Sequence, residues 1–170
     1  MRTCGSSPKS SPQYAAAICS ARGDDGAPAL IDVAVMEIRQ TTPPDAYETM
    51  QRDPTTVYLD VRTPEEFAAG HPAGALNVPV IFFRAGGSSP NPDFVTAVQR
   101  LVPPTTPLLV GCQTGGRSQR GAELLVAAGH TAVSNVRGGF GGARDETGRV
   151  VTPGWRDAGL PVETGPGSKA

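Results

Sequence analysis

The sequence predicts an α/β domain with a mostly parallel sheet. Short apolar segments alternate with segments that carry helix start and stop signals, which is the order of repeated strand–helix units. Two of the apolar segments, residues 57–61 and 107–112, have the short and mostly apolar character of strands buried on both faces. The chain has 170 residues, which suits one domain of ordinary size.

The composition narrows the function classes. The net charge is −1 at pH 7, which gives no electrostatic case for a nucleic acid or an anionic membrane as partner. No apolar run reaches the length of a membrane span. Gly (21) and Pro (17) together exceed a fifth of the chain, so long loops or tails are expected.

The two ends of the chain are predicted to lie outside the domain. Residues 1–30 are predicted to form a disordered leader, because their apolar run is too short for a signal peptide. A cleaved or lipid-modified leader that acts through Cys4 or Cys19 is the alternative. The predicted domain spans residues 31–163, and residues 164–170 form a disordered tail. The expected location is cytoplasmic, with import into an organelle as the alternative.

The first predicted elements are a strand and a helix. Residues 33–38 (VAVMEI) form a short apolar run with strand character. Thr42 is a suitable helix cap, and the two prolines after it suit a first helical turn. Three side chains then share one face of this helix: Ala46, Tyr47 and Met50.

A second strand–helix unit follows. The run VYLDV at residues 57–61 is predicted to be a buried strand. Thr63 then caps a short helix, and Gly70 ends it. Glu65 and Glu66 lie in the first turn, at the positive end of the helix dipole.

The middle of the chain is predicted to contain a strand at residues 75–80 and a loop at residues 84–93. Asp93 is expected to cap the next helix. The apolar face of that helix is formed by Phe94, Val95, Val98 and Leu101. These elements continue the alternation of strands and helices.

The last part of the chain repeats the pattern once more. The predicted elements are a strand at 107–112, a helix at 118–128, a strand at 131–136, a Gly-rich loop at 138–154, a helical turn at 155–159 and then a tail. Ala122, Leu125 and Val126 are expected to face inward from the helix, which Gly129 ends.

Cysteine usage directs attention to one residue. Of the three cysteines, two lie in the predicted leader, so they do not form a disulfide framework with the third. Cys112 ends the strand at 107–112, and parallel sheets place their functional sites beyond the carboxyl ends of their strands. A small buried hydrophobic residue is the alternative to a nucleophile at this position.

The loop after Cys112 is suited to hold an anion. It consists of Gln113, Thr114, Gly115, Gly116, Arg117 and Ser118. Two adjacent glycines permit a tight curve that turns successive backbone N–H groups inward. The helix that starts near Arg117 adds its unpaired N–H groups, and these effects favour a thiolate over a thiol. Such a cysteine can attack phosphate, giving a phosphocysteine, or a sulfane sulfur, giving a persulfide.

The loop CQTGGRS at residues 112–118 resembles the active-site loop of the rhodanese (sulfurtransferase) family. Three further segments resemble that family in the same order: YLDVRTPEEFAAGHPAGALNVPV at 58–80, NVRGGFGGA at 135–143 and WRDAGLPVE at 155–163. The context of these segments is most similar to the single-domain group of plant senescence-associated and chloroplast rhodanese-like proteins. Pro72 departs from the family, which usually has an apolar residue after Gly-His.

This resemblance implies a rhodanese-like fold, with a five-stranded parallel sheet sandwiched between helices. It implies that Cys112 is the catalytic, sulfur-accepting nucleophile. The loop amides from Gln113 to Ser118 would cradle the outer persulfide sulfur, and Arg117 would help to bind an anionic donor. Asp60 and Arg62 match a step of the family that supports this loop.

The resemblance also implies the partners of the reaction. The donor is thiosulfate or a related persulfide, and the acceptor is cyanide, a thiol or a cysteine of a partner protein. No metal and no organic cofactor is implied, and the sequence predicts no oligomeric state.

Two other functions stay open. The first is a phosphatase or arsenate reductase on the same fold, and the second is a non-catalytic rhodanese module that binds a partner protein. The loop length favours sulfur, because four residues separate Cys112 from Arg117, whereas the related phosphatases and arsenate reductases have five. A shorter loop makes a tighter cradle, which suits one sulfur atom better than a tetrahedral phosphate.

Overall fold

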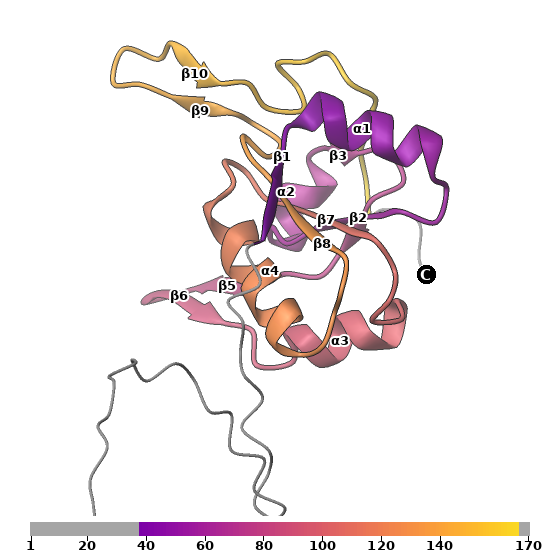
Figure 1. The fold of residues 1–170 in the computed structure, drawn as a ribbon. Helices are drawn as coiled ribbons and strands as arrows, with labels where there is room; N and C mark the ends of the chain where they lie inside the picture. The colour runs from indigo at the N-terminus through magenta and orange to yellow at the C-terminus, as the bar shows by residue number, and fades with distance from the viewer. Residues whose placement is uncertain (1–37, 167–170) are drawn as a thin grey trace, which may run out of the picture. The chain divides into compact units, whose positions relative to one another are not determined.

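The computed structural model describes residues 38–166 and contains a central five-stranded sheet (Figure 1). Its strands are, in spatial order, β1 (Arg39–Thr41), β8 (Val133–Val136), β7 (Leu108–Gly111), β2 (Val57–Asp60) and β4 (Leu76–Asn77). All four neighbouring pairs are parallel. The predicted α/β class and the implied five-stranded parallel sheet are therefore confirmed.

Helices cover both faces of this sheet. They are α1 (Pro43–Arg52), α2 (Pro64–Ala68), α3 (Phe94–Leu101) and α4 (Gly116–Ala127). Figure 1 shows α1 and α2 above the sheet and α3 and α4 below it. Two buried clusters correspond to the two faces, one with side chains of α3 and α4 and the other with side chains of α1 and α2.

The alternation of side chains along the strands explains the two clusters. In β2, Tyr58 packs with the α1–α2 cluster and Leu59 with the α3–α4 cluster. In β7, Leu109 and its neighbour Val110 divide in the same way. Because both faces of the sheet are covered, the sequences of the central strands β2 and β7 are apolar at nearly every position.

The predicted helix starts are confirmed at two of the helices. The Thr42 side chain accepts a hydrogen bond from the backbone N–H of Asp45, and Pro43 occupies the first helical position of α1. At α2, Thr63 and Glu66 form a reciprocal capping box. Asp93 is the N-cap residue of α3, as predicted, but its side chain makes no capping hydrogen bond. α4 begins at Gly116, two residues before the predicted start.

Three short antiparallel strand pairs lie outside the central sheet. They are β5 (Ile81–Arg84) with β6 (Gly87–Pro90), β9 (Ala143–Arg144) with β10 (Val150–Thr152), and β3 (His71–Pro72) with β11 (Val162–Glu163). The loops predicted at 84–93 and 138–154 are therefore wrong in part, because each contains strands of a hairpin. Their Gly-rich sequences show no alternation, and glycines with positive φ such as Gly86 (112°) and Gly148 (82°) help the chain to turn.

The ends of the predicted domain differ from the expectation in detail. The strand predicted at 33–38 lies outside the described residues except for Ile38, which precedes β1. β1 is polar, and as an edge strand it is held by its backbone pairing with β8. The prediction of a tail after residue 159 is wrong at β11, because backbone pairing with β3 does not require an apolar pattern. The leader predicted at 1–30 lies outside the described residues, and the domain boundaries stay predictions.

The strand predicted at 75–80 is also shorter in the structure, where β4 contains only Leu76 and Asn77. Pro79 has no backbone N–H and cannot continue the hydrogen-bond ladder. The chain then leaves the sheet toward the β5–β6 hairpin.

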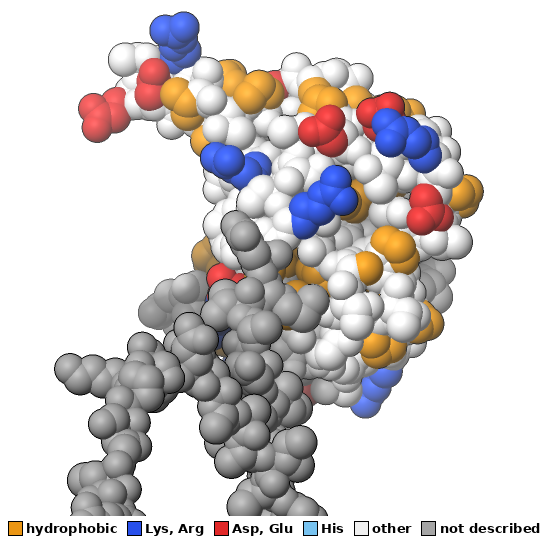
Figure 2. Space-filling view, in the orientation of Figure 1, with side chains coloured by type: hydrophobic (Ala, Val, Ile, Leu, Met, Phe, Trp, Pro, Cys, Tyr) orange, Lys and Arg blue, Asp and Glu red, His pale blue; other side chains and the backbone are white. Residues whose placement is uncertain are grey.

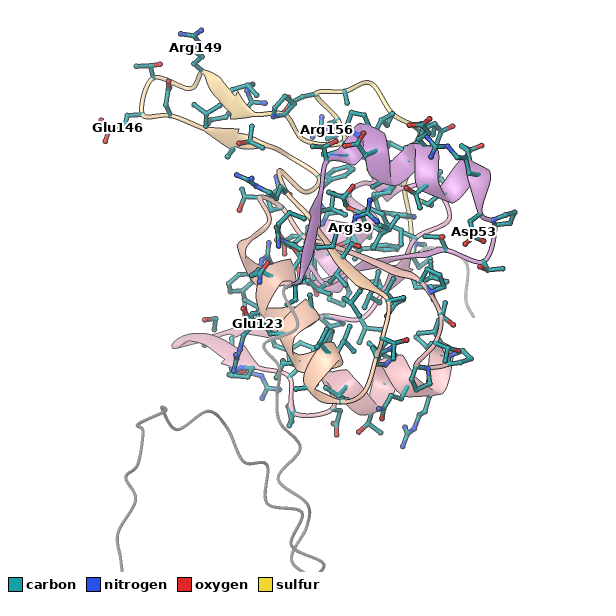
Figure 3. All side chains as sticks on the ribbon, viewed as in Figure 1. Arg39, Asp53, Glu123, Glu146, Arg149 and Arg156 are labelled. Carbon is teal, nitrogen blue, oxygen red and sulfur yellow. The ribbon has the colours of Figure 1, made fainter. Side chains whose placement is uncertain are left out.

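The surface of the domain carries charges of both signs. Figure 2 shows Arg side chains interspersed with Asp and Glu on the face in view. Glu146 and Arg149 lie at the tip of the β9–β10 hairpin, away from the sheet (Figure 3). Within residues 38–166 no helix has both the length and the apolar character needed to cross a membrane.

The strand order places a topological switch point between β2 and β7. After β2 the chain continues to β4 on one side, and after α3 it returns to β7 on the other side of β2. The connections that leave β2 and β7 pass over opposite faces of the sheet, so a crevice opens outside the carboxyl ends of these two strands. Cys112 follows β7 at this crevice, and Asp60 ends β2 beside it.

Candidate active site

Cys112 lies at the base of a tight loop, residues 112–118, which we call the cysteine loop. The side chain is 2% exposed. Its sulfur accepts a hydrogen bond from the backbone N–H of Gly115 at 3.2 Å and lies 3.5 Å from Oγ of Ser118. The sulfur thus contacts two polar groups of the loop that follows it in its own chain.

The shape of the cysteine loop depends on Gly115. This residue has a φ of 112° and precedes the first residue of α4. A side chain at this position would be strained in that conformation. The turn brings the Gly115 N–H onto the sulfur and directs the N-terminus of α4 toward it, which gives an anion at this point both a donor and the positive end of the helix dipole.

The other residues of the predicted cradle divide into two groups. Gly115 and Ser118 are buried against the sulfur, whereas Gln113, Thr114 and Gly116 are exposed at the outer side of the loop. The backbone N–H of Gly115 is the loop amide that contacts Cys112. The structure therefore brings part of the predicted cradle onto the sulfur and leaves the rest where a bound donor can reach it.

The Gly-rich turn after β8 holds the start of the cysteine loop. The N–H of Phe140 donates to the Cys112 carbonyl at 2.7 Å, and the N–H of Gly141 donates to the Gln113 carbonyl at 2.9 Å. A Cβ added at Gly139 would lie 2.2 Å from the Cys112 carbonyl oxygen. The glycine at 139 is therefore required by this close approach of two backbones.

Asp60 and Arg62 form a pair that we call the buried pair. Their side chains are 1% and 2% exposed, and Nη2 of Arg62 lies 2.7 Å from Oδ2 of Asp60. Arg62 also donates to the Gly70 carbonyl at 2.7 Å and to Oε1 of Gln113 at 3.3 Å, and its guanidinium lies over the ring of Phe140. The buried pair thus links the end of β2 to the cysteine loop.

Arg117 and Glu66 form a second pair, which we call the mouth pair. Two guanidinium nitrogens of Arg117 donate to the two carboxylate oxygens of Glu66, each at 2.7 Å. The side chains are 22% and 30% exposed. The hydrogen bonds from Arg117 lower the pKa of Glu66 below its ordinary value of 4.5. Arg117, the residue expected to bind an anionic donor, is therefore held by a carboxylate from α2.

Comparison with known proteins agrees with this arrangement. The sequence profile described as the rhodanese-like domain matches residues 42–146, which is more than half of the chain. The chain belongs to the rhodanese-like domain family. The resemblance to this family is thereby confirmed, and three of the four sequence segments lie within the matched residues.

Relatives of this rhodanese-like protein include two from plants. Thiosulfate sulfurtransferase 16, chloroplastic, from Arabidopsis thaliana is 48% identical over 83 residues, which cover 49% of this chain and 69% of that protein. The senescence-associated protein DIN1 from Raphanus sativus is 36% identical over 106 residues. Those residues cover 62% of this chain and 51% of DIN1, so the chain spans about half the length of that relative.

A solved structure extends the comparison to three dimensions. The crystal structure of Rv0390 from M. tuberculosis superposes with a TM-score of 0.63 and 31% sequence identity. The match covers 74% of this chain and 97% of that protein.

Two of the cavities beside the cysteine loop of this rhodanese-like protein include a residue of the mouth pair. One of about 560 Å³ lies between α4 and the segment around β5 and β6; its lining is mostly apolar and includes Gly116, Arg117 and Arg120. The other, of about 440 Å³, is lined by Arg62, Glu66, Ala69, Gln113, Phe140 and Arg156. The mouth pair contributes one residue to each cavity, so a molecule that approaches the loop from either side meets it.

The sequence did not predict the contacts of three residues around the cysteine loop. Glu66 was assigned only to the dipole of α2, although its spacing from Thr63 marked a capping box whose carboxylate can also reach outward. Asn135 accepts from Ser118, and Gln40 accepts from Asn135, on strands far apart in the sequence. No local signal identifies Asn135 or Gln40, because their contacts depend on the order of the strands.

Proposed function

We propose that this rhodanese-like protein is a sulfurtransferase that moves a sulfane sulfur from thiosulfate or a persulfide donor to a thiophilic acceptor. The observation that carries the proposal is the surrounding of the Cys112 sulfur. A backbone N–H lies 3.2 Å from it and a serine hydroxyl 3.5 Å from it, at the N-terminus of a helix. The backbone N–H and the helix N-terminus favour negative charge on Cys112 and on a sulfur bound to it, and the serine hydroxyl can turn to donate to that charge.

The first step is attack on the donor. The Cys112 thiolate, which has released its proton to solvent, forms a bond to the outer sulfur of thiosulfate. The S–S bond of the donor breaks, and sulfite leaves with the electron pair. Because the Cys112 side chain is 2% exposed, the attacked sulfur has to be terminal and unhindered. Thiosulfate and hydropersulfides offer such a sulfur.

The second step returns the cysteine to its starting state. An acceptor nucleophile, such as cyanide, a thiol or a cysteine of a partner protein, attacks the outer sulfur of the Cys112 persulfide. The bond between the two sulfurs breaks, and Cys112 leaves as a thiolate. The N–H groups at the start of α4 stabilise the negative charge in both steps, which is a use of fixed dipoles in a shielded site.

Arg117 has a place in donor binding under this proposal. Its guanidinium contributes to the lining of the apolar cavity and holds Glu66 at the mouth of the loop. A guanidinium recognises oxyanions in the same bidentate geometry that it uses for a carboxylate. The sulfonate end of thiosulfate therefore competes with Glu66 for Arg117.

The test is the intact mass of the purified protein after incubation with thiosulfate, with Cys112→Ser measured beside the wild type. The wild type is expected to gain about 32 Da, one sulfur, and to lose it on addition of cyanide, as an activated thiolate would. Cys112→Ser is expected to keep its circular dichroism spectrum and to gain no mass. Equal mass gain in the serine variant would contradict the proposal.

The two alternatives have their own readouts in the same experiment. A phosphatase or arsenate reductase hydrolyses an aryl phosphate or reduces arsenate and forms no persulfide with any donor. A non-catalytic module forms no persulfide and shows the alkylation rate of an ordinary thiol. Cytoplasm and organelle are distinguished by imaging of the tagged protein; thiosulfate sulfurtransferase 16 from Arabidopsis thaliana is a chloroplastic relative.

A further inference from the structure

A chain of hydrogen bonds from the edge of the sheet reaches the Cys112 sulfur. The side-chain nitrogen Nε2 of Gln40 lies 3.0 Å from the carbonyl oxygen of Ile38. A backbone carbonyl can only accept a hydrogen bond, so the amino end of the Gln40 amide has to point toward it. The oxygen Oε1 of Gln40 is thereby fixed on the other side.

The orientation of Gln40 fixes the orientation of Asn135. Oε1 of Gln40 lies 2.8 Å from Nδ2 of Asn135, which donates to it. These residues are register partners on the neighbouring strands β1 and β8, so their side chains leave the same face of the sheet. Oδ1 of Asn135 consequently faces Ser118, at 2.7 Å from its Oγ.

The orientation of Asn135 decides where the Ser118 proton lies. Two acceptors that have no proton to give compete for the single hydroxyl proton of Ser118: Oδ1 of Asn135, at 2.7 Å from its Oγ, and the Gly115 carbonyl oxygen, at 3.0 Å. The shorter contact is the one to Asn135, so the proton is donated there. Oγ of Ser118 then presents only lone pairs to the Cys112 sulfur, 3.5 Å away. In this state Ser118 can accept a hydrogen bond from a thiol, but it cannot donate one to a thiolate.

We infer that Asn135, oriented by Gln40, is a positioning residue that directs the Ser118 hydroxyl away from the Cys112 sulfur until that sulfur becomes anionic. When the sulfur ionises or carries a second sulfur, the Ser118 hydroxyl leaves Asn135 and donates to the anion. That exchange replaces a neutral hydrogen bond with a charge-assisted one. The assignment rests on the proposed function only in taking Cys112 as the reacting group.

The inference can be tested without changing any charged group near Cys112. The charged and titratable side chains around it are Tyr58, Asp60 and Arg62 from β2 and the residues after it, Glu66 from α2 and Arg117 from α4. Asn135 and Gln40 carry no charge. Replacing them by leucine therefore changes the hydrogen-bond direction at Ser118 without changing the charge near the sulfur.

The experiment is the rate of alkylation of Cys112 by iodoacetamide as a function of pH, in the full chain and followed by the mass of the peptide that contains Cys112. Asn135→Leu is expected to lower the midpoint of this pH profile by about 0.5–1 pH unit, because the thiolate then competes for the Ser118 proton with the Gly115 carbonyl and no longer with Asn135. In a Ser118→Ala background the same substitution is expected to leave the midpoint unchanged. An equal shift in both backgrounds, or no shift in the first, would overturn the inference.

Variants at Gln40 provide the matched test should Asn135→Leu fail to fold, since Gln40 is an exposed residue of an edge strand. Gln40→Leu removes the group that orients Asn135 and is expected to lower the midpoint in the same direction. Gln40→Glu keeps an acceptor for Nδ2 of Asn135 and is expected not to lower it. A midpoint that falls with glutamate as much as with leucine would overturn the inference. The alkylation measurement requires no sulfur transfer, so its outcome is independent of the thiosulfate mass test.

Discussion

Two arginine–carboxylate pairs flank the cysteine loop, and they differ in depth. The buried pair, Asp60 with Arg62, is 1–2% exposed, whereas the mouth pair, Glu66 with Arg117, is 22–30% exposed. Both pairs hold their partners at 2.7 Å. The same chemical pairing therefore occurs in two environments beside one reacting cysteine.

The difference in depth separates support from recognition. When both members of an ion pair are buried, neither can change its partner without leaving a buried charge unpaired. The buried pair is therefore fixed, and it supports Gln113 through the hydrogen bond from Arg62. The mouth pair is partly exposed, and such a pair is weak because water competes for both charged groups. Arg117 can leave Glu66 for an anion at small energetic cost, whereas Arg62 cannot leave Asp60.

The largest effect is expected from breaking the buried pair. Arg62→Met leaves the Asp60 carboxylate in the interior without its cation and removes the donor to the Gly70 carbonyl. The free energy of unfolding, measured by urea denaturation, is expected to fall by about 3–5 kcal/mol. Arg120→Met, at a side chain that is 69% exposed, is the matched control and should change it by less than about 0.5 kcal/mol. A loss from Arg62→Met no larger than the control would remove the distinction between the pairs.

Breaking the mouth pair is expected to affect sulfur loading more than stability. Arg117→Gln removes one charge-assisted contact with the donor, so the second-order rate constant of persulfide formation from thiosulfate should fall about tenfold or more. The free energy of unfolding should change by less than about 1 kcal/mol. Glu66→Gln should instead raise that rate constant, since it releases Arg117. Rates equal to wild type in both variants would show that Arg117 only shapes the loop.

A smaller effect is expected from the acid titration of the mouth pair. The hydrogen bonds from Arg117 lower the folded-state pKa of Glu66 below its ordinary value of 4.5. The stabilisation from this carboxylate is therefore complete above pH 4.5 and is lost as the pH falls through the lowered pKa. A carbon-13 NMR titration of the Glu66 carboxyl should move back toward 4.5 in Arg117→Gln. An unchanged midpoint would show that the pair does not persist in solution.

The smallest effect concerns His130, whose contribution to the pH dependence of stability begins at a higher pH than that of Glu66 in the mouth pair. Its side chain is 1% exposed, and neither ring nitrogen has a hydrogen-bond partner among the described residues. Burial lowers its pKa below the ordinary 6.5. The unfolded chain therefore binds the proton first, and stability declines as the pH falls below 6.5. His130→Leu should flatten the melting temperature over this range, and an unchanged slope would exclude His130 as its source.

The two pairs also differ in whether their contacts could be predicted from the sequence. Asp60 and Arg62 are two residues apart at the end of one strand, so their support of the loop was implied by a local segment. Glu66 and Arg117 are 51 residues apart, and their contact depends on α2 and α4 reaching the same crevice from opposite faces of the sheet. Residues that lie close in sequence were assigned correctly to one pair, and the second pair was not predicted.

The same limit applies to the fold. The buried strands β2 and β7 and the capped helices α1 and α2 could be predicted because the apolar runs and the capping residues that mark them lie within one short segment. The structure confirms these elements. The hairpins β5–β6 and β9–β10 and the pairing of β11 with β3 were missed. Their strands are held by backbone hydrogen bonds to a partner segment, which leave little trace in the side chains.

The sequence by itself determined the class of the domain, the cysteine at a strand end and the Gly-rich turn that follows it. The reason is that hydrophobic periodicity, caps and glycines act on the residues next to them. Only the tertiary structure decided which side chains meet the Cys112 sulfur and which arginine is free to move. Those contacts join β1, β2, β8, α2 and α4, and the depth at which each lies follows from packing of the whole domain.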